Sequence, residues 1–128
     1  MVIAIDGPAG SGKSTTAKIA AEKLGFNHIN TGAMYRGITL KCIQGEIDLN
    51  STSGIEIILN QTEFMFGGDR GSALFMDGVD ISSGIISSKV TELVSRVSAI
   101  PMVREKLVQY QREMAKGLDV VLEDGQVD

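Results

Sequence analysis

The sequence predicts an α/β protein with a parallel sheet flanked by helices, and three features of the 128-residue chain indicate this class. A short apolar run, Val2–Ile5, opens the chain and leads directly into a glycine-rich loop and a helical pattern. A second run of this kind lies near the other end, at residues 120–122. Short apolar runs rich in β-branched residues are typical of strands that are covered on both faces. Helical patterns fill most of the chain between the two runs, so we expect layers of helices on a sheet.

The loop after the first strand has the spacing G-x-x-x-x-G-K-S from Gly7 to Ser14. Glycines at Gly7, Gly10 and Gly12 allow the backbone N–H groups to turn inward and a phosphate chain to approach closely. A helix that begins near Lys13 adds the positive end of its dipole. Lys13 is placed to reach the β- and γ-phosphates, and the Ser14 hydroxyl to complete a Mg²⁺ shell. The motif therefore predicts ATP-like nucleoside triphosphate binding with Mg²⁺, against the alternative of an ordinary strand–helix turn.

The residues expected to hold the triphosphate are Gly7, Pro8, Ala9, Gly10, Ser11, Gly12, Lys13, Ser14 and Thr15, with Ser14 as the metal ligand. The helix after the loop carries apolar residues at positions 17, 20, 21 and 24, the first three of them alanines, and small residues at this spacing let a helix lie close to a sheet. Gly25 stands where a helix C-cap glycine belongs, and residues 26–29 read as a second strand. His28 in this strand has no catalytic or metal-binding partners in the nearby sequence, which favours a structural role.

Asn30 or Thr31 is expected to cap a second helix, which carries Ala33, Gly37 and Leu40 on one face. Tyr35 and Arg36 then stand on its first turns. The free N–H groups of a capped helix start favour an anion, and a guanidinium can fork onto phosphate oxygens. We therefore expect Arg36 to bind phosphate; the alternative is a solvated surface charge.

The middle of the chain predicts a small β insert between helices. A polar connection leads to a short helix over residues 52–59, and residues 63–66 and 73–78 then read as two strands. Hairpin residues at 67–72 join them, and Arg70 in this loop is expected to be a solvated charge.

Two amphipathic helices follow the insert. Their apolar positions are Val90, Leu93, Val94 and Val97 in the first, and Val103, Leu107, Tyr110 and Met114 in the second, which begins after Pro101. We expect both apolar faces to pack in the core. Ser95 and Arg104 belong to these helices, and spacing alone leaves open whether they are functional or merely on the surface. The run at residues 120–122 is expected to return to the main sheet.

Composition excludes several function classes. With 12 basic and 16 acidic residues the formal charge is −4, so the chain has no general basic surface for nucleic acid. Cys42 is the single cysteine, so no internal disulfide is possible; we expect it to be a small core residue, in keeping with a cytoplasmic protein. The sequence shows no apolar run of the ~20 residues that a membrane span needs and no export signal. We therefore expect no nucleic-acid partner and no membrane association.

Five stretches together resemble the cytidylate kinase family, the bacterial CMP kinase branch of the nucleoside monophosphate kinases. They read IAIDGPAGSGKSTTAK, INTGAMYRGITL, LFMDGVDIS, VSRVSAIPMVREKLVQYQREMA and VVLEDG. The resemblance runs through nearly the whole chain, and the pairing of TGAMYR with the VS-x-VSA-x-P-x-VR pattern is specific to this family among related kinases.

The resemblance implies a P-loop fold, a three-layer parallel sheet flanked by helices, with a small β-containing CMP-binding insert. It implies a core over residues 1–61, the insert over 62–100, and a return to the core over 101–128. It also implies ATP with Mg²⁺ and CMP or dCMP as substrates of a monomeric enzyme. Lys13 and Arg36 are then the catalytic residues. The acceptor contacts are expected from Thr31, Tyr35, Arg36, Ser95 and Arg104, with Arg36 on the CMP phosphate and the last two on the cytosine edge.

The sequence departs from the family at its end. Where the family carries D-G-R-D-I-G-T, this chain reads Asp124-Gly125-Gln126-Val127-Asp128, so an expected phosphate ligand and an expected base ligand are both replaced. We therefore expect a C-terminally truncated chain that turns over little CMP by itself and is prone to self-association. The alternatives are a non-catalytic nucleotide- or phosphate-binding fragment, or another small-acceptor P-loop kinase.

Overall fold

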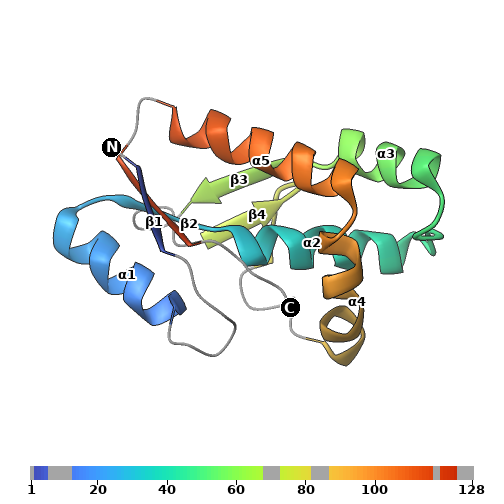
Figure 1. Cartoon of the computed structure of the whole chain (residues 1–128), viewed down its shortest axis with the longest axis horizontal. Coiled ribbons are helices and arrows are strands. Elements are labelled where there is room, and N and C mark those ends of the chain that lie inside the picture. Colours follow the sequence, from blue (N-terminus) through green and yellow to red (C-terminus); the bar gives the residue numbers. More distant parts are fainter. Residues whose placement is uncertain (1, 6–12, 68–72, 82–86, 117–118, 124–128) are drawn as a thin grey trace.

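The computed structural model describes residues 2–5, 13–67, 73–81, 87–116 and 119–123 of the chain. Helices and two small sheets make up this part of the molecule (Figure 1). The helices are α1 (Lys13–Leu24), α2 (Thr31–Gln44), α3 (Thr52–Gln61), α4 (Ser88–Ser98) and α5 (Pro101–Ala115). The strands are β1 (Val2–Ile5), β2 (Asn27–Asn30), β3 (Phe64–Gly67), β4 (Ala73–Met76), β5 (Val79–Asp80) and β6 (Val120–Glu123). This mixture confirms the predicted α/β class.

The first sheet joins strands from the two ends of the described chain. Its order is β1-β6-β2, and β6 pairs in parallel with both neighbours. Ile5 of β1 and Asn30 of β2 both stand opposite Glu123 of β6. The prediction that the late apolar run returns to the main sheet is therefore confirmed. The carboxyl ends of all three strands meet at one edge of this sheet.

The junction between α1 and β2 follows the predicted glycine cap. Gly25 has φ +69°, a left-handed conformation that glycine adopts at low cost, and the Phe26 N–H donates to the Ala21 carbonyl at 3.0 Å. Because this bond uses Phe26 to close the helix, β2 begins at Asn27, one residue later than expected. Ala21 is buried and packs with Ile5 and Phe26, which holds α1 against the parallel sheet.

The second sheet has one strand more than the sequence analysis predicted. Strands β3 and β4 pair antiparallel as expected, and β5 adds to β4 through a two-residue turn at Asp77 and Gly78. Their φ values are +52° and +82°. Two successive positive φ angles are typical of a type I′ hairpin turn, which Asp-Gly favours. The expected strand over residues 73–78 is thus a strand followed by this turn. The predicted loop at 67–72, with Arg70, lies almost wholly outside the described residues.

The larger core surrounds α2. Met34 and Ile38 of this helix are 0% and 1% exposed, and side chains of the antiparallel sheet, α3, α4 and α5 pack around them. Figure 1 shows these elements gathered to the right of the parallel strands, with α1 at the lower left. The other core residues are Ala33, Tyr35, Cys42, Ile55, Ile58, Leu59, Phe64, Leu74, Met76, Ile81, Val94, Val97, Val103 and Leu107. The expected burial of Cys42 is therefore confirmed. The apolar faces of α4 and α5 are buried as expected where the structure describes them, except that Leu93 and Tyr110 are only half-buried; the Met114 side chain lies outside the described residues. Leu40 of α2 is also half-buried.

Side-chain caps and proline explain where the later helices begin. The Ser51 hydroxyl accepts from the Gly54 N–H at the start of α3, and the Ser87 hydroxyl accepts from the Val90 N–H at the start of α4. Pro101 occupies the first turn of α5, where its missing N–H costs no helical hydrogen bond. In the part of the chain that the structure describes, every helix is too short or too polar to cross a bilayer.

Candidate active site

The parallel sheet positions the strand that precedes the predicted phosphate loop. β1 ends at Ile5 and α1 begins at Lys13, so the loop connects the carboxyl end of a strand to the start of a helix, as the motif requires. Residues 7–12 of the loop lie outside the described residues. Lys13, Ser14 and Thr15 form the first turn of α1, where the backbone N–H groups have no partner within the helix. This helix start is therefore suited to an anion.

The acceptor residues of α2 begin at the same sheet edge. β2 ends at Asn30, opposite Glu123, and Thr31 is the first residue of α2. Ligands of open α/β sheets bind outside the carboxyl ends of the strands. The register thus brings the end of β1, which precedes the motif, and the start of α2 to one edge of the sheet, although 15 residues lie between Ser14 and Asn30.

Burial separates the roles of the three predicted residues in α2. Thr31 and Tyr35 are 2% and 8% exposed, whereas Arg36 is half-buried and its Nε is enclosed by protein. The Tyr35 carbonyl accepts from the buried Thr39 hydroxyl at 2.8 Å. Thr31 and Tyr35 are therefore fixed in the helix packing, and Arg36 is the member of this group with a partly accessible, cationic side chain.

Ser95 and Arg104 lie on two successive helices and are both exposed. Ser95 is on α4, and its carbonyl accepts from the Ser98 hydroxyl at 3.1 Å near the end of the helix. Arg104 is on the first turn of α5 and lines a shallow hollow of about 380 Å³, together with Glu105, Val108, Gln109 and Arg112. The structure therefore places both side chains within reach of solvent, but on helices other than α2, so their convergence with Arg36 on one ligand stays a prediction.

Two contacts that sequence reasoning missed hold the antiparallel sheet against the helices. Lys41 of α2 pairs with the carboxylate of Asp77 in the β4–β5 turn. Asp77 also accepts from the Glu63 N–H at 2.9 Å and donates its own N–H to the Glu63 carbonyl at 2.8 Å. The Lys41 hydrogen bond, with the Glu63 N–H as a lesser cause, lowers the pKa of Asp77 below its ordinary value. The Asp-Gly dipeptide was the sequence signal for this turn.

The second contact joins α5 to the end of α3. The Tyr110 hydroxyl donates to the Thr62 carbonyl at 2.6 Å, and the Tyr110 ring meets Phe64 edge to face with centroids 5.9 Å apart. The Lys106 amine lies 5.3 Å from the centre of the same ring. Burial, followed by the negative charges of Glu63, Glu113 and Asp77, raises the pKa of Tyr110.

Other chemistries find little support in the described part of the chain. No group of three or more His, Cys, Asp or Glu side chains is arranged there to hold a metal ion. Cys42 is buried, and burial raises the pKa of its thiol. A thiol held in its protonated form is a poor nucleophile.

The fold and the motif together define an α/β protein with a phosphate-binding sequence between β1 and α1. The family model described as cytidylate kinase matches residues 3–126. A cytidylate kinase of Chloroherpeton thalassium is 44% identical over 126 residues, which cover 96% of this chain and 52% of that protein. A cytidylate kinase of Caldanaerobacter subterraneus is 47% identical over 121 residues, covering 94% of this chain and 53% of that protein. One of Pelotomaculum thermopropionicum is 46% identical over 123 residues, covering 94% and 54%.

The chain therefore belongs to the cytidylate kinase family, as its sequence motifs indicated. It spans about half the length of the curated relatives it matches.

Proposed function

We propose that the protein represented by this chain transfers the γ-phosphoryl group of ATP to CMP or dCMP, giving ADP and CDP or dCDP. The observation that carries the proposal is the common sheet edge, where the motif at the start of α1 follows β1 and the start of α2 follows β2, on either side of β6. Phosphoryl transfer between two phosphates depends mainly on positioning and on cations along the line of transfer. A triphosphate on one element and an acceptor phosphate on the other would meet at this edge.

The motif and the positions of α1 and α2 support the following roles. Residues 7–15 would hold the triphosphate, with Lys13 on its β- and γ-phosphates. Ser14, in the first turn of α1, would give its hydroxyl to Mg²⁺, which neutralises the developing phosphate charge. Arg36 would hold the acceptor phosphate, supported by Thr31 and Tyr35 in the same helix.

The base of the acceptor would be read on the other helices. Ser95 and Arg104 are exposed and polar, so both are accessible to hydrogen-bond a cytosine edge. Residues 62–100 would form the CMP-binding insert on the P-loop core. A polar readout of this kind discriminates between bases when the bound nucleotide covers these side chains, because a wrong base then leaves their donors unpaired. We further propose a cytoplasmic monomer, as the family resemblance and the single cysteine led us to expect.

Titration of the 128-residue chain with CMP, dCMP, UMP and AMP, combined with a phosphotransfer assay using ATP, tests the proposal. Arg36→Ala should weaken the binding of all four nucleotides by about tenfold, because it removes a charge-assisted contact to the phosphate that they share. Arg104→Ala should weaken the binding of CMP and dCMP but not that of UMP and AMP. Lys116→Ala, which removes a positive charge at the exposed end of α5 and outside the hollow that Arg104 lines, serves as the control and should leave nucleotide preference unchanged.

Equal affinity for all four nucleotides in the unmodified chain would contradict the assignment of the acceptor. Binding of ATP and CMP without transfer, in a chain extended to the length of the relatives, would instead support the alternative role of a non-catalytic nucleotide-binding unit.

A further inference from the structure

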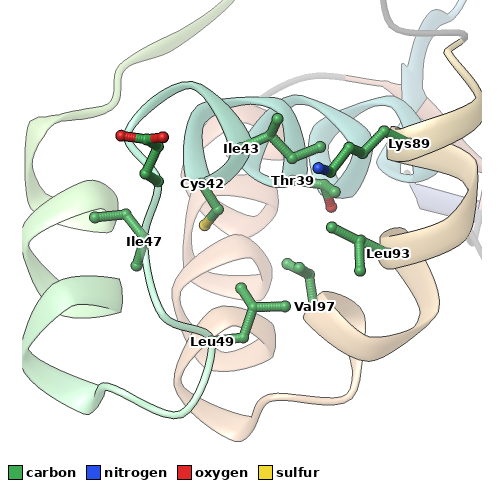
Figure 2. Close-up of a pocket in the computed structure, with 9 residues that line it drawn as sticks. Thr39, Cys42, Ile43, Ile47, Leu49, Lys89, Leu93 and Val97 are labelled. Carbon is green, nitrogen blue, oxygen red and sulfur yellow. The ribbon is translucent and has the colours of Figure 1, made fainter.

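A half-open hollow of about 360 Å³ lies between α2, α4 and the connection that follows α2 (Figure 2). Its volume falls within the ~300–1,000 Å³ that is typical of small-molecule sites. None of the proposed nucleotide-binding residues lines it. The hollow is therefore a separate feature of the fold, and the proposed kinase activity does not account for it.

The walls of the hollow are apolar. Its base is formed by Thr39 and Cys42 of α2, both of which are buried. The Thr39 hydroxyl donates to the Tyr35 carbonyl within its own helix, so its proton is already engaged. The apolar wall residues are Ile43, Ile47, Leu49, Leu93 and Val97. This lining favours binding of the hydrocarbon part of a ligand.

Lys89 supplies the positive charge of the lining. It lies in the first turn of α4, two residues after the capping residue Ser87, and Figure 2 shows its side chain extending from α4 toward α2. Among the described residues no carboxylate pairs with its amine. The start of α4 adds the positive end of the helix dipole at the same place. An anion at this rim therefore meets two favourable electrostatic contributions.

We propose that this hollow binds a small amphipathic monocarboxylate, with its hydrocarbon chain against Leu93 and Val97 and its carboxylate at Lys89. Glu46 contributes the opposite charge to the lining, so a second anionic group on the ligand would meet repulsion. The site therefore selects a single negative charge at one end of an apolar chain. A dicarboxylate of the same length binds less well.

The probes are octanoate, octanol, octylamine and suberate, titrated into the ¹⁵N-labelled 128-residue chain below the concentrations at which the amphiphiles aggregate. Octanoate should shift the amide signals of Thr39, Ile43 and Leu93 and should bind more tightly than the other three. Octanol has the same hydrocarbon chain without a charge, octylamine has the opposite charge, and suberate has a second carboxylate, so the three serve as controls. Octanol binding as tightly as octanoate, or octanoate shifts confined to other parts of the chain, would overturn the proposal.

Charge variants at Lys89 distinguish specific binding of octanoate in the hollow from nonspecific adsorption to apolar surface. Lys89→Gln should weaken the binding of octanoate roughly three- to tenfold, as expected for the loss of a partly exposed contact between charges. Lys89→Glu should reverse the preference toward octylamine, and its fold should persist because an acidic residue is favourable in a first helical turn. Lys23→Gln, at an exposed position near the end of α1, is the control and should change nothing. Unchanged octanoate binding in Lys89→Glu would refute the proposal, whatever the nucleotide titrations show.

Discussion

Lys41 of α2 and Asp77 of the β4–β5 turn form an ion pair that ties the antiparallel sheet to the central helix, although 36 residues separate them in the sequence. Arg36 lies five residues before Lys41 on the same helix. The pair therefore helps to fix the proposed CMP-binding insert relative to Arg36, the residue proposed to bind the acceptor phosphate.

Asp77→Asn tests this pair. Asparagine tolerates the positive φ and keeps an oxygen for the Glu63 N–H, so only the charge is lost. The Asp77 side chain is 37% exposed, and we expect the free energy of unfolding at neutral pH to fall by no more than about 1 kcal/mol. Because folding lowers the pKa of Asp77, its stabilisation is present above the unfolded pKa of about 3.9 and is lost as the pH falls through the folded value.

Urea denaturation at neutral pH and in acid, well below the unfolded pKa, measures this dependence. The difference between Asp77→Asn and the unmodified chain should shrink in acid, and a Lys41→Met background should remove it at every pH. A difference that persists in acid would mean that the turn, and not the ion pair, is responsible.

Tyr110→Phe removes one hydroxyl and keeps the edge contact with Phe64. The Thr62 carbonyl then loses its donor, and we expect the free energy of unfolding to fall by about 1 kcal/mol. Folding raises the pKa of Tyr110, so this contribution is complete below the unfolded value of about 10 and disappears as the pH rises through the folded value. Thermal unfolding of both proteins from neutral to alkaline pH should show their midpoints converging at high pH.

Gly37→Ala tests the close approach of α2 to the antiparallel sheet. A Cβ at this position would lie 3.0 Å from Ile81 Cδ1 and 3.2 Å from Met76 Sδ, closer than ordinary contact. Overpacking of this kind costs about 1–3 kcal/mol, which exceeds the gain of up to about 1 kcal/mol in helix propensity. We therefore expect net destabilisation in chemical denaturation.

The double variant Gly37→Ala/Ile81→Val provides the control, because valine lacks the Cδ1 atom that the new Cβ would meet. The alanine should cost less in this background than alone, giving a coupling energy of the sign that relieved crowding requires. If the two substitutions changed the free energy of unfolding additively, a contact other than that with Ile81 would limit the approach of α2 to the sheet.

The elements with strong local signals were predictable from sequence, whereas the contacts between them were not. The apolar spacing of α4 and α5 and the cap at Gly25 were visible in the sequence, and the helices and cap appear where expected. Strand β5 was missed because two residues carry too little periodicity, although the Asp-Gly turn before it was a usable signal. The same holds for the site. The motif that contains Lys13 and the helix that carries Arg36 are local patterns, but the parallel pairing that brings β1 and β2 to one sheet edge depends on β6, which lies far along the chain from both.

The most direct test of the central claim is the affinity of the 128-residue chain for ATP with Mg²⁺, measured by calorimetry for the unmodified chain, Lys13→Ala and Lys23→Ala. Lys13 stands in the phosphate-binding motif, whereas Lys23 is an exposed residue near the other end of the same helix. Our account predicts that Lys13→Ala weakens ATP binding by at least about tenfold, and that Lys23→Ala leaves it within about twofold of the unmodified chain. Equal losses in the two variants, or ATP binding that does not depend on Lys13, would contradict it.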